Sequence, residues 1–165
     1  MSETYLTLSV GGLPPFSSRG CRQELKPIET AETHRTVNGE LVTTTTPLHH
    51  KYRTLIKGKD QLPAALDSMW KGQDVKVGCI QYLWQKAEGK KVLLNREPIK
   101  GSLVAINELR KKVKIQSIQD KEVELAEPGF VGYRPRLYMK LVDFGYETEE
   151  WGNGEITWYM KLEEV

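Results

Sequence analysis

The segment from residue 134 to 164 constrains the fold most, because its apolar side chains recur with the two-residue period of a β-strand. The apolar positions fall on one face of each of two strands, which are Leu137, Met139 and Leu141 in the first and Ile156, Trp158, Met160 and Leu162 in the second. Successive side chains of a strand point to opposite faces, so each strand buries one face in a core. We therefore predict two core strands, residues 137–144 and 156–162, with Trp158 as the anchor.

Strand signals dominate the rest of the chain as well. Apolar patterns predict strands at residues 4–10, 50–57, 74–85, 91–95, 113–118 and 122–126, of which 74–85 is the most buried. Short strands at this spacing are typical of an antiparallel β-sandwich or a partial barrel. At 165 residues the chain is large enough for one substantial core. We expect a single β-domain over residues 1–165, in which residues 1–32 form a less regular N-terminal segment.

One segment has the pattern of a helix, from Gln61 to Lys71. Asp60 suits the N-cap, Pro63 is tolerated in the first turn, and Gly72 suits the position just past the end. The apolar residues of the segment recur at helical spacing: Leu62, Leu66, Met69 and Trp70. A single short helix must pack on a sheet, so we predict one flanking α-helix with Trp70 as its largest anchor.

A hairpin is predicted at residues 35–46. Asn38 and Gly39 stand between two short strand patterns, and an Asn-Gly pair suits the positive φ angles of a two-residue turn. The two arms are rich in threonine and hold few large apolar residues, of which Leu41 is one. Because such arms bury little, we expect the hairpin to project from the body.

Charge is distributed unevenly along the chain. Residues 143–165 hold seven acidic residues and one basic residue, a charge of −6, which leaves +8 for the remainder of a chain whose net charge is +2. The best basic cluster is Arg110, Lys111 and Lys112, with Lys114 beside it. The acidic end is either a solvated edge or the surface that meets a basic neighbour.

An aromatic side chain stands in the acidic connection between the two closing strands. Trp151 follows Glu149 and Glu150 and precedes Gly152. A tryptophan in such a polar loop either packs back on its own domain or is buried by a neighbouring molecule. The candidate interface residues are therefore Asn38, Gly39, Leu41, Arg110, Lys111, Lys112, Glu149, Glu150 and Trp151.

The sequence carries no pattern for catalysis, a cofactor or a metal. Ser17 and Ser18 lack the context of a nucleophile, and neither a Gly-x-Ser-x-Gly motif nor a phosphate-binding loop is present. His49 and His50 are adjacent, so on a strand they point to opposite faces and do not share a metal ion. His34 stands alone. We expect no catalytic, cofactor-binding or metal-binding residues.

The cysteines and the first residues say little about the cellular compartment of the protein. Cys21 and Cys79 are the two cysteines, and the sequence leaves open whether they form a disulfide. The first four residues have neither the basic nor the apolar region of a secretion signal. No apolar run approaches the length of about 18 residues that a membrane helix needs, so we expect no membrane partner.

The order of these features resembles a known family. The chain presents a projecting Asn-Gly hairpin (residues 36–46), a strand (51–56), a short helix (61–71) and a long central strand (75–84). It closes with Tyr133-Arg134-Pro135, Glu150-Trp151-Gly152 and a strand from Trp158 to Glu164. From about residue 33 onward it is similar to small structural proteins of tailed-bacteriophage tails. The most similar are tail-tube-like proteins of the tube, its initiator ring, and the baseplate and neck adaptors.

The resemblance implies a β-sandwich or partial barrel with one flanking helix, whose copies assemble into rings, often hexamers, by extending sheets between neighbours. It implies contacts with other phage tail or baseplate proteins, passive contact with DNA in a lumen, and a place in the virion tail after assembly in the host cytoplasm. The hairpin of that family reaches an adjacent subunit or ring. The family has no catalytic residues, and this chain lacks a strongly acidic lumen pattern.

Two other classes of function fit the residues. A monomeric carbohydrate- or peptide-binding β-sandwich would use Trp151, Tyr146 and Tyr133 as exposed aromatic contacts. A head-tail neck protein or another nucleic-acid binder would contact phosphate through residues 110–114. Aromatic residues for base stacking are not interleaved with that cluster.

Overall fold

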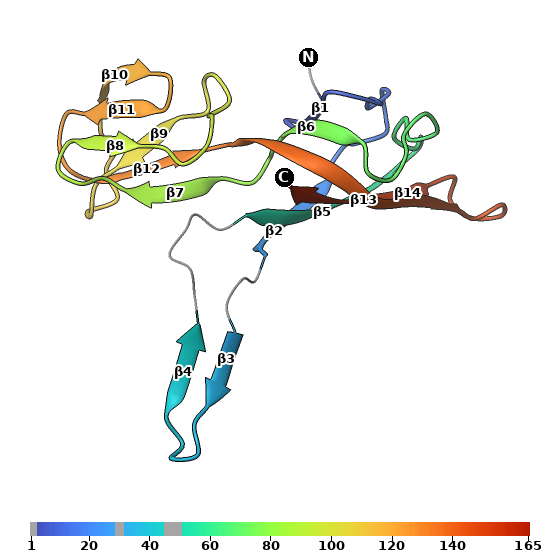
Figure 1. Cartoon of the computed structure of the whole chain (residues 1–165). Helices are drawn as coiled ribbons and strands as arrows, with labels where there is room; N and C mark the ends of the chain where they lie inside the picture. Colours follow the sequence, from blue (N-terminus) through green and yellow to red (C-terminus); the bar gives the residue numbers. More distant parts are fainter. Residues whose placement is uncertain (1–2, 29–31, 45–50) are drawn as a thin grey trace.

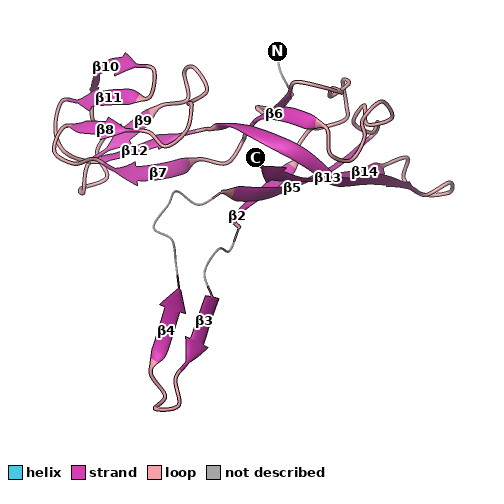
Figure 2. Cartoon of the chain, in the orientation of Figure 1, coloured by secondary structure: helices cyan, strands magenta, loops and turns pink. Residues whose placement is uncertain are grey.

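The computed structural model describes residues 3–28, 32–44 and 51–165 (Figure 1). The predicted mainly β, antiparallel fold is confirmed, and the described residues contain fourteen strands and no helix (Figure 2). Six strands form one curled sheet, here called the large sheet. Six more form two three-stranded sheets, which together are called the small lobe. The remaining two strands, the third and fourth along the chain, form a separate hairpin, called the arm.

The large sheet contains both closing strands at its centre. Its order is β1 (Thr7–Leu8), β6 (Asp74–Gly78), β13 (Arg136–Thr148), β14 (Ile156–Glu164), β5 (Tyr52–Asp60) and β2 (Arg22–Pro27). The two predicted closing strands are confirmed, and they pair: β13 and β14 run antiparallel with Leu141 opposite Leu162 and Tyr146 opposite Trp158. Loops at residues 9–21 and 61–73 supply further apolar side chains to the core over the inner face of the sheet.

Trp158 is the anchor of this core, as predicted. It is fully buried, and its Nε1 donates a hydrogen bond to the carbonyl oxygen of Ser17 at 2.7 Å. Its ring lies over Gly58 of β5, where any Cβ atom would collide with the indole. The anchor therefore holds the N-terminal loop against the sheet and requires glycine at position 58.

The predicted helix at residues 61–71 is wrong, because this segment forms turns. The backbone N–H groups of Leu62 and Ala65 donate to the carbonyls of Phe16 and Gly12 in the N-terminal loop, and not to the preceding turn of a helix. Pro63 has no N–H to donate. Leu66 and Met69 are buried as the helical stripe required, whereas Leu62 and Trp70 are exposed. Trp70 is therefore no anchor.

Asp60, the expected helix cap, is instead the last residue of β5 and binds the N-terminal loop. Its carboxylate accepts hydrogen bonds from Arg19 Nη2 at 2.7 Å, Arg19 Nε at 3.0 Å and the backbone N–H of Arg19 at 3.1 Å. The side chain of Asp60 is buried, and its pairing with Arg19 holds its pKa well below the ordinary value. The Asp60 carboxylate therefore accepts hydrogen bonds from Arg19 in the N-terminal loop instead of from the first turn of a helix.

This contact makes the protein sensitive to acid in a defined window. A carboxylate whose folded-state pKa is depressed stabilises the fold above its unfolded value of 3.8, and the contribution is lost as the pH falls below that value towards the folded-state pKa. We expect Asp60→Asn to be less stable than wild type at neutral pH and to lose less additional stability between about pH 4 and pH 2. Urea unfolding at neutral pH measures the first effect, and urea unfolding at several pH values within the acid window measures the second.

Asp67→Asn is the matched control, because Asp67 is exposed on the same loop and forms no ion pair among the described residues. Its acid profile should follow that of wild type. Parallel profiles for Asp60→Asn and wild type would contradict a role for Asp60 in acid sensitivity.

The small lobe is a second, barrel-like body with its own core. One sheet has the order β10 (Ile115–Gln119), β11 (Glu122–Leu125) and β8 (Lys91–Leu93), and the other β7 (Leu83–Lys86), β12 (Phe130–Tyr133) and β9 (Val104–Ile106). The strands predicted at residues 113–118 and 122–126 are confirmed as β10 and β11, which pair antiparallel. The Val113 N–H donates to the carbonyl of Ala105, and the Gln85 amide bonds to Leu93 and Asn95, which links the two sheets on both sides.

The predicted long strand at residues 74–85 is in fact two strands in different sheets. β6 belongs to the large sheet and β7 to the small lobe. Between them, Gln23 Oε1 accepts the backbone N–H groups of Ile80 at 2.8 Å and Gln81 at 3.2 Å. Cys79 donates its N–H to the carbonyl of Pro135. The backbone N–H groups of residues 79–81 therefore have hydrogen-bond acceptors outside a strand ladder. The chain can pass from the large sheet to the small lobe at these residues.

Both cysteines are free, so the disulfide that the sequence left open does not form. Cys79 is buried in the core of the large sheet, and burial raises the pKa of its thiol to about 12. Cys21 is partly buried, and its sulfur lies 3.3 Å from Thr4 Oγ1. Cys79 is thus a small core residue.

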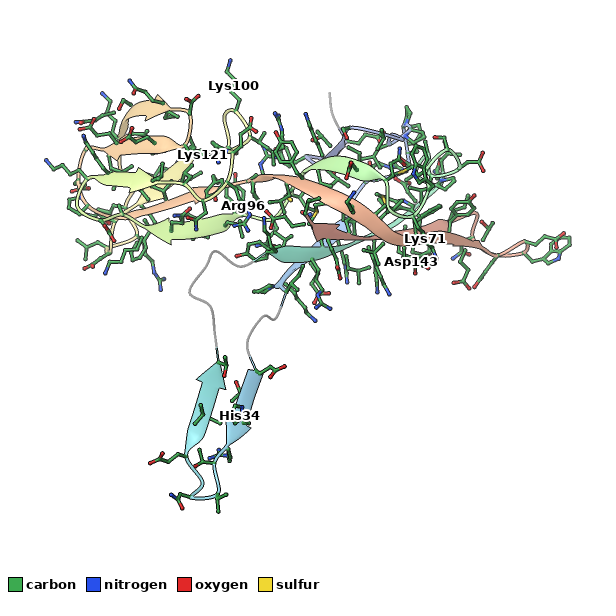
Figure 3. All side chains as sticks on the ribbon, viewed as in Figure 1. His34, Lys71, Arg96, Lys100, Lys121 and Asp143 are labelled. Carbon is green, nitrogen blue, oxygen red and sulfur yellow. The ribbon has the colours of Figure 1, made fainter. Side chains whose placement is uncertain are left out.

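A buried ion pair joins the large sheet to the small lobe. Arg96 follows β8, and its Nε and Nη2 donate to the Glu164 carboxylate at 2.9 Å each, at the end of β14. Glu164 also accepts the backbone N–H of Tyr52, whose ring lies 4.7 Å from the Arg96 guanidinium. Figure 3 places Arg96 between the two bodies. The side chains of Arg96 and Glu164 are only 10% and 11% exposed.

The arm consists of β3 (Glu32–Arg35) and β4 (Leu41–Thr44), and Figure 1 draws it extending away from the body. The Ile28 N–H donates to the carbonyl of Lys51 at 2.7 Å, which continues the β2–β5 ladder towards the arm. The predicted two-residue turn at Asn38 and Gly39 is wrong by one residue, because Val37 and Asn38 are its central pair. The Gly39 N–H donates to Thr36, and Gly39 itself takes a φ of 84° after the turn.

Candidate assembly surfaces

The first candidate surface is the arm, which carries Asn38, Gly39 and Leu41. All its described residues, 32–44, are exposed, including Leu41 and Val42. The side-chain contacts among its described residues are internal, such as Arg35 Nη1 to the Gly39 carbonyl at 3.0 Å and Thr33 Oγ1 to Thr43 Oγ1 at 3.4 Å. Residues 45 and 46 of the predicted hairpin lie outside the described residues. The arm therefore presents apolar side chains without covering them.

The second surface is the turn between β13 and β14, here called the acidic tip (residues 147–155). Glu149, Glu150 and Trp151 are all exposed, and Trp151 is 93% exposed. Trp151 does not pack back on its own domain, which settles one of the two alternatives that the sequence left open. A hollow of about 160 Å³ beside the turn is lined by Lys59, Glu147, Glu149, Asn153, Glu155 and Thr157.

The third surface is the loop from Asn107 to Lys112, here called the basic loop. The Asn107 Oδ1 accepts the backbone N–H groups of Leu109 and Lys111 at 3.0 Å each, and the Asn107 N–H donates to the Lys111 carbonyl. Arg110 has a φ of 61°, which the surrounding hydrogen bonds hold in place. The loop is thus built to a fixed shape, with Arg110, Lys111 and Lys112 exposed.

A hollow of about 350 Å³ lies beside the basic loop and is called the end hollow. Its lining combines apolar and polar groups: Lys86, Ala87, Asn107, Glu108, Leu109, Pro128, Gly129 and Phe130. Leu109 is 76% exposed at its rim. Sequence reasoning missed Leu109 and Phe130, because an isolated leucine in a loop and a phenylalanine at a strand start have no periodic signal.

The structure does not bring the three surfaces together into one site. The register of β12 places Phe130 beside Ile106, so the basic loop lies beyond the start of β12, while the chain runs from β12 through β13 to the acidic tip. The acidic tip and the basic loop therefore lie at opposite ends of the body, and the arm extends from a third side (Figure 1). Such separated surfaces can contact several neighbours at once.

The outer face of the large sheet carries a further group of cations that sequence reasoning missed. Side chains of β2, β5 and β14 that point away from the core include Arg22, Lys26, Arg53, Lys57, Lys59 and Lys161, with Glu24 and Glu163 among them. The alternation of cations at positions 53, 57 and 59, opposite to the buried Thr54 and Ile56, was the signal that could have found this face.

The aromatic residues of the proposed sugar or peptide site do not form one surface. Tyr133 is buried in the core of the small lobe, where its Oη lies 3.4 Å from Gln85 Oε1 and burial raises its pKa. Tyr146 and Trp151 are exposed near the acidic tip. Only two of the three aromatic residues are therefore accessible.

The described residues contain no group of His, Cys, Asp and Glu side chains that could hold a metal ion. His34 is exposed on β3 (Figure 3), and His49 and His50 lie outside the described residues. Within the same described ranges, no helix is long and apolar enough to cross a membrane.

Comparisons with known proteins found no match for this chain, neither among protein-family models nor among curated proteins or solved structures. Its function is therefore argued from the surfaces themselves.

Proposed function

We propose that this protein is a structural subunit of a phage virion tail, in the tube, the tube initiator or a baseplate ring, and that it acts by oligomeric assembly without catalysis. The observation that carries the proposal is the arm. An isolated two-stranded hairpin is marginally stable in water, and this one leaves all its described side chains exposed. A neighbouring molecule that covers Leu41 and Val42 would supply the burial that the arm lacks.

The edges of the large sheet support the same proposal. The sheet is open at β1 and at β2, and an open edge offers backbone groups to a neighbouring strand. Edge contacts between copies close into a ring when the rotation between neighbours permits it, and six copies is the number that the resemblance implies. The partners would be copies of this chain and other tail or baseplate proteins, joined in the host cytoplasm and retained in the virion.

Two features separate this proposal from a monomeric sugar- or peptide-binding module. Tyr133 is buried, so the aromatic platform of that module is incomplete. The arm also adds no described side-chain contact to the body of its own chain: its hydrogen bonds join residues 33–43 to one another.

Mass spectrometry and electron microscopy of purified virions test the proposal. We expect the chain in the particles at a stoichiometry that fits a ring, and antibody labelling at the tail. Absence of the chain from intact particles would contradict the proposed function.

Removing the arm is expected to separate folding from assembly. A variant in which a short Gly-Ser linker replaces residues 32–44 should retain the stability of the body within about 0.5 kcal/mol, because the arm buries none of its side chains there. The same variant should fail to enter particles. Urea unfolding and complementation of particle assembly measure the two effects.

The double substitution Leu41→Asp and Val42→Asp should reproduce the assembly defect without shortening the chain. Leu93→Asp, at an exposed leucine of the small lobe, is the matched control and should assemble normally. Normal assembly of the armless chain would show that the arm is dispensable.

A further inference from the structure

We propose that copies of this chain join head to tail, with the acidic tip of one copy seated in the end hollow of the next. The inference rests on the proposed function in treating the chain as a subunit of an assembly, and it names the contact. Trp151 would enter the end hollow while Glu149 and Glu150 face the basic loop.

The acidic tip has the properties of an inserting surface. Trp151 is 93% exposed at the far end of a two-stranded projection, and tryptophan is enriched among the residues that contribute most to binding at protein interfaces. Glu147, Glu149 and Glu150 surround it, and the nearby Lys59 is already paired with Glu155 at 3.2 Å. The tip therefore combines one large apolar group with uncompensated negative charge.

The end hollow has the properties of the receiving surface. Ala87, Phe130 and the exposed Leu109 give it apolar walls, and an indole buries about 150–250 Å² when it is enclosed. Lys86 and Glu108 line the hollow with opposite charges, and the loop that contributes Leu109 to the lining continues into three exposed cations, Arg110, Lys111 and Lys112. Glu127 accepts a hydrogen bond from Asn107 at 3.3 Å. Lys86, the basic loop and Glu127 together hold four positive and two negative charges, so this group of residues is net positive.

Both surfaces are held in place before contact. The basic loop is fixed by the three hydrogen bonds of Asn107, and the tip is the end of the paired strands β13 and β14. Preorganised surfaces lose less conformational entropy on binding than flexible ones, so a small contact can suffice.

Charge and position exclude the symmetric alternatives. A tip meeting a tip brings carboxylates together, and a basic loop meeting a basic loop brings cations together, so both contacts are repulsive. A tip meeting an end hollow pairs opposite charges. Because the two surfaces lie at opposite ends of the body (Figure 1), this contact is heterologous and repeats from copy to copy.

Two variants that each remove one surface test the contact. Trp151→Ala removes the tip and leaves the end hollow intact, whereas Leu109→Asp damages the hollow and leaves the tip intact. We expect wild type to form species larger than two chains in sedimentation velocity at concentrations on the order of 100 μM, where micromolar contacts are populated. Each variant alone should associate at least tenfold more weakly.

An equal mixture of the two variants is the decisive sample. The intact tip of Leu109→Asp should bind the intact hollow of Trp151→Ala, which yields a two-chain species that the tip contact cannot extend further. Trp70→Ala and Leu93→Asp are matched controls, because they alter a tryptophan that is 62% exposed and a leucine that is 69% exposed outside the two surfaces. Both controls should associate as wild type does.

A charge exchange provides independent evidence. Glu149→Lys with Glu150→Lys should weaken association, and Arg110→Glu with Lys111→Glu in the same chain should restore it. The inference is overturned if wild type remains monomeric at these concentrations, if Trp151→Ala associates normally, or if the mixture gives no two-chain species.

Failure of the head-to-tail contact can be distinguished from failure of the proposed function. A chain that is present in virions but whose Trp151→Ala variant associates normally would retain the function and lose the contact. A chain that joins head to tail but is absent from virions would retain the contact and lose the function.

Discussion

Replacing Glu164 with alanine is expected to destabilise the protein by about 3–5 kcal/mol, because it removes one charge of a buried ion pair. Arg96 is only 10% exposed, and Glu164 accepts two of its hydrogen bonds. The same carboxylate accepts the backbone N–H of Tyr52 at 2.9 Å, so the substitution also leaves this donor without that acceptor. Urea unfolding, followed by tryptophan fluorescence, measures the loss.

Glu163→Ala is the matched control for this prediction. Glu163 is adjacent in sequence, exposed on the outer face of the sheet, and without an ion pair among the described residues. Its replacement should change stability by no more than about 0.5 kcal/mol.

Replacing both members of the pair should cost less than replacing Glu164 alone. Arg96→Met with Glu164→Leu removes both charges together, and buried ion pairs replaced by apolar side chains are often neutral in stability. Equal losses for Glu164→Ala and Glu163→Ala would show that the pair contributes nothing.

Replacing Trp158 with alanine is expected to cost about 3–5 kcal/mol, the usual range for removing a large buried aromatic side chain. The substitution opens a cavity over Gly58 and removes the donor of the 2.7 Å bond to Ser17. Because that bond holds the N-terminal loop, the loop should also become more accessible. Chemical denaturation gives the free energy, and limited proteolysis within residues 14–20 reports the loop.

The other tryptophans provide the contrast. Trp70 and Trp151 are exposed, so alanine at either position should change stability by no more than about 0.5 kcal/mol. Trp158→Phe is the intermediate case, since it keeps most of the volume but leaves the Ser17 carbonyl without its donor. A loss for Trp151→Ala as large as that for Trp158→Ala would contradict the exposed position of the tip.

Sequence periodicity predicted the parts of the fold whose partners lie in regular sheets. The two closing strands, the β10–β11 pair and the core position of Trp158 were all readable from the alternation of apolar residues. These elements are specified locally, because a strand with one buried face carries its own pattern.

The errors at residues 61–71 and 74–85 have one physical cause, which is hydrogen bonding between segments distant in sequence. The segment from Asp60 to Gly72 has an N-cap residue, an apolar stripe and a terminating glycine, all typical of a helix. The N-terminal loop instead supplies carbonyl acceptors for two of its backbone N–H groups. Gln23 ends the apparent long strand by bonding to Ile80 and Gln81, which lie more than fifty residues away. Neither the N-terminal loop nor Gln23 can be identified as a hydrogen-bond partner from the apolar pattern of residues 61–71 or 74–85.

The candidate interface was predictable by residue type but not by arrangement. Trp151, Glu149 and Glu150 stood out because an aromatic residue in an acidic loop is unusual, and their exposure agrees with that reading. The end hollow was not predictable, since it forms where three separate segments of the small lobe meet.

The attachment of the arm gives the protein a mechanical property. The arm is joined to β2 and β5, which lie side by side in the large sheet, and the bond from Ile28 to Lys51 continues their ladder outward. A pull on the arm along the direction of β5 would load the ladder between β5 and β14, from Arg53 to Asp60, in shear. Hydrogen bonds loaded in shear bear force together, whereas those peeled from one end break in turn. An assembly gripped by such arms would resist tension through the centre of each subunit.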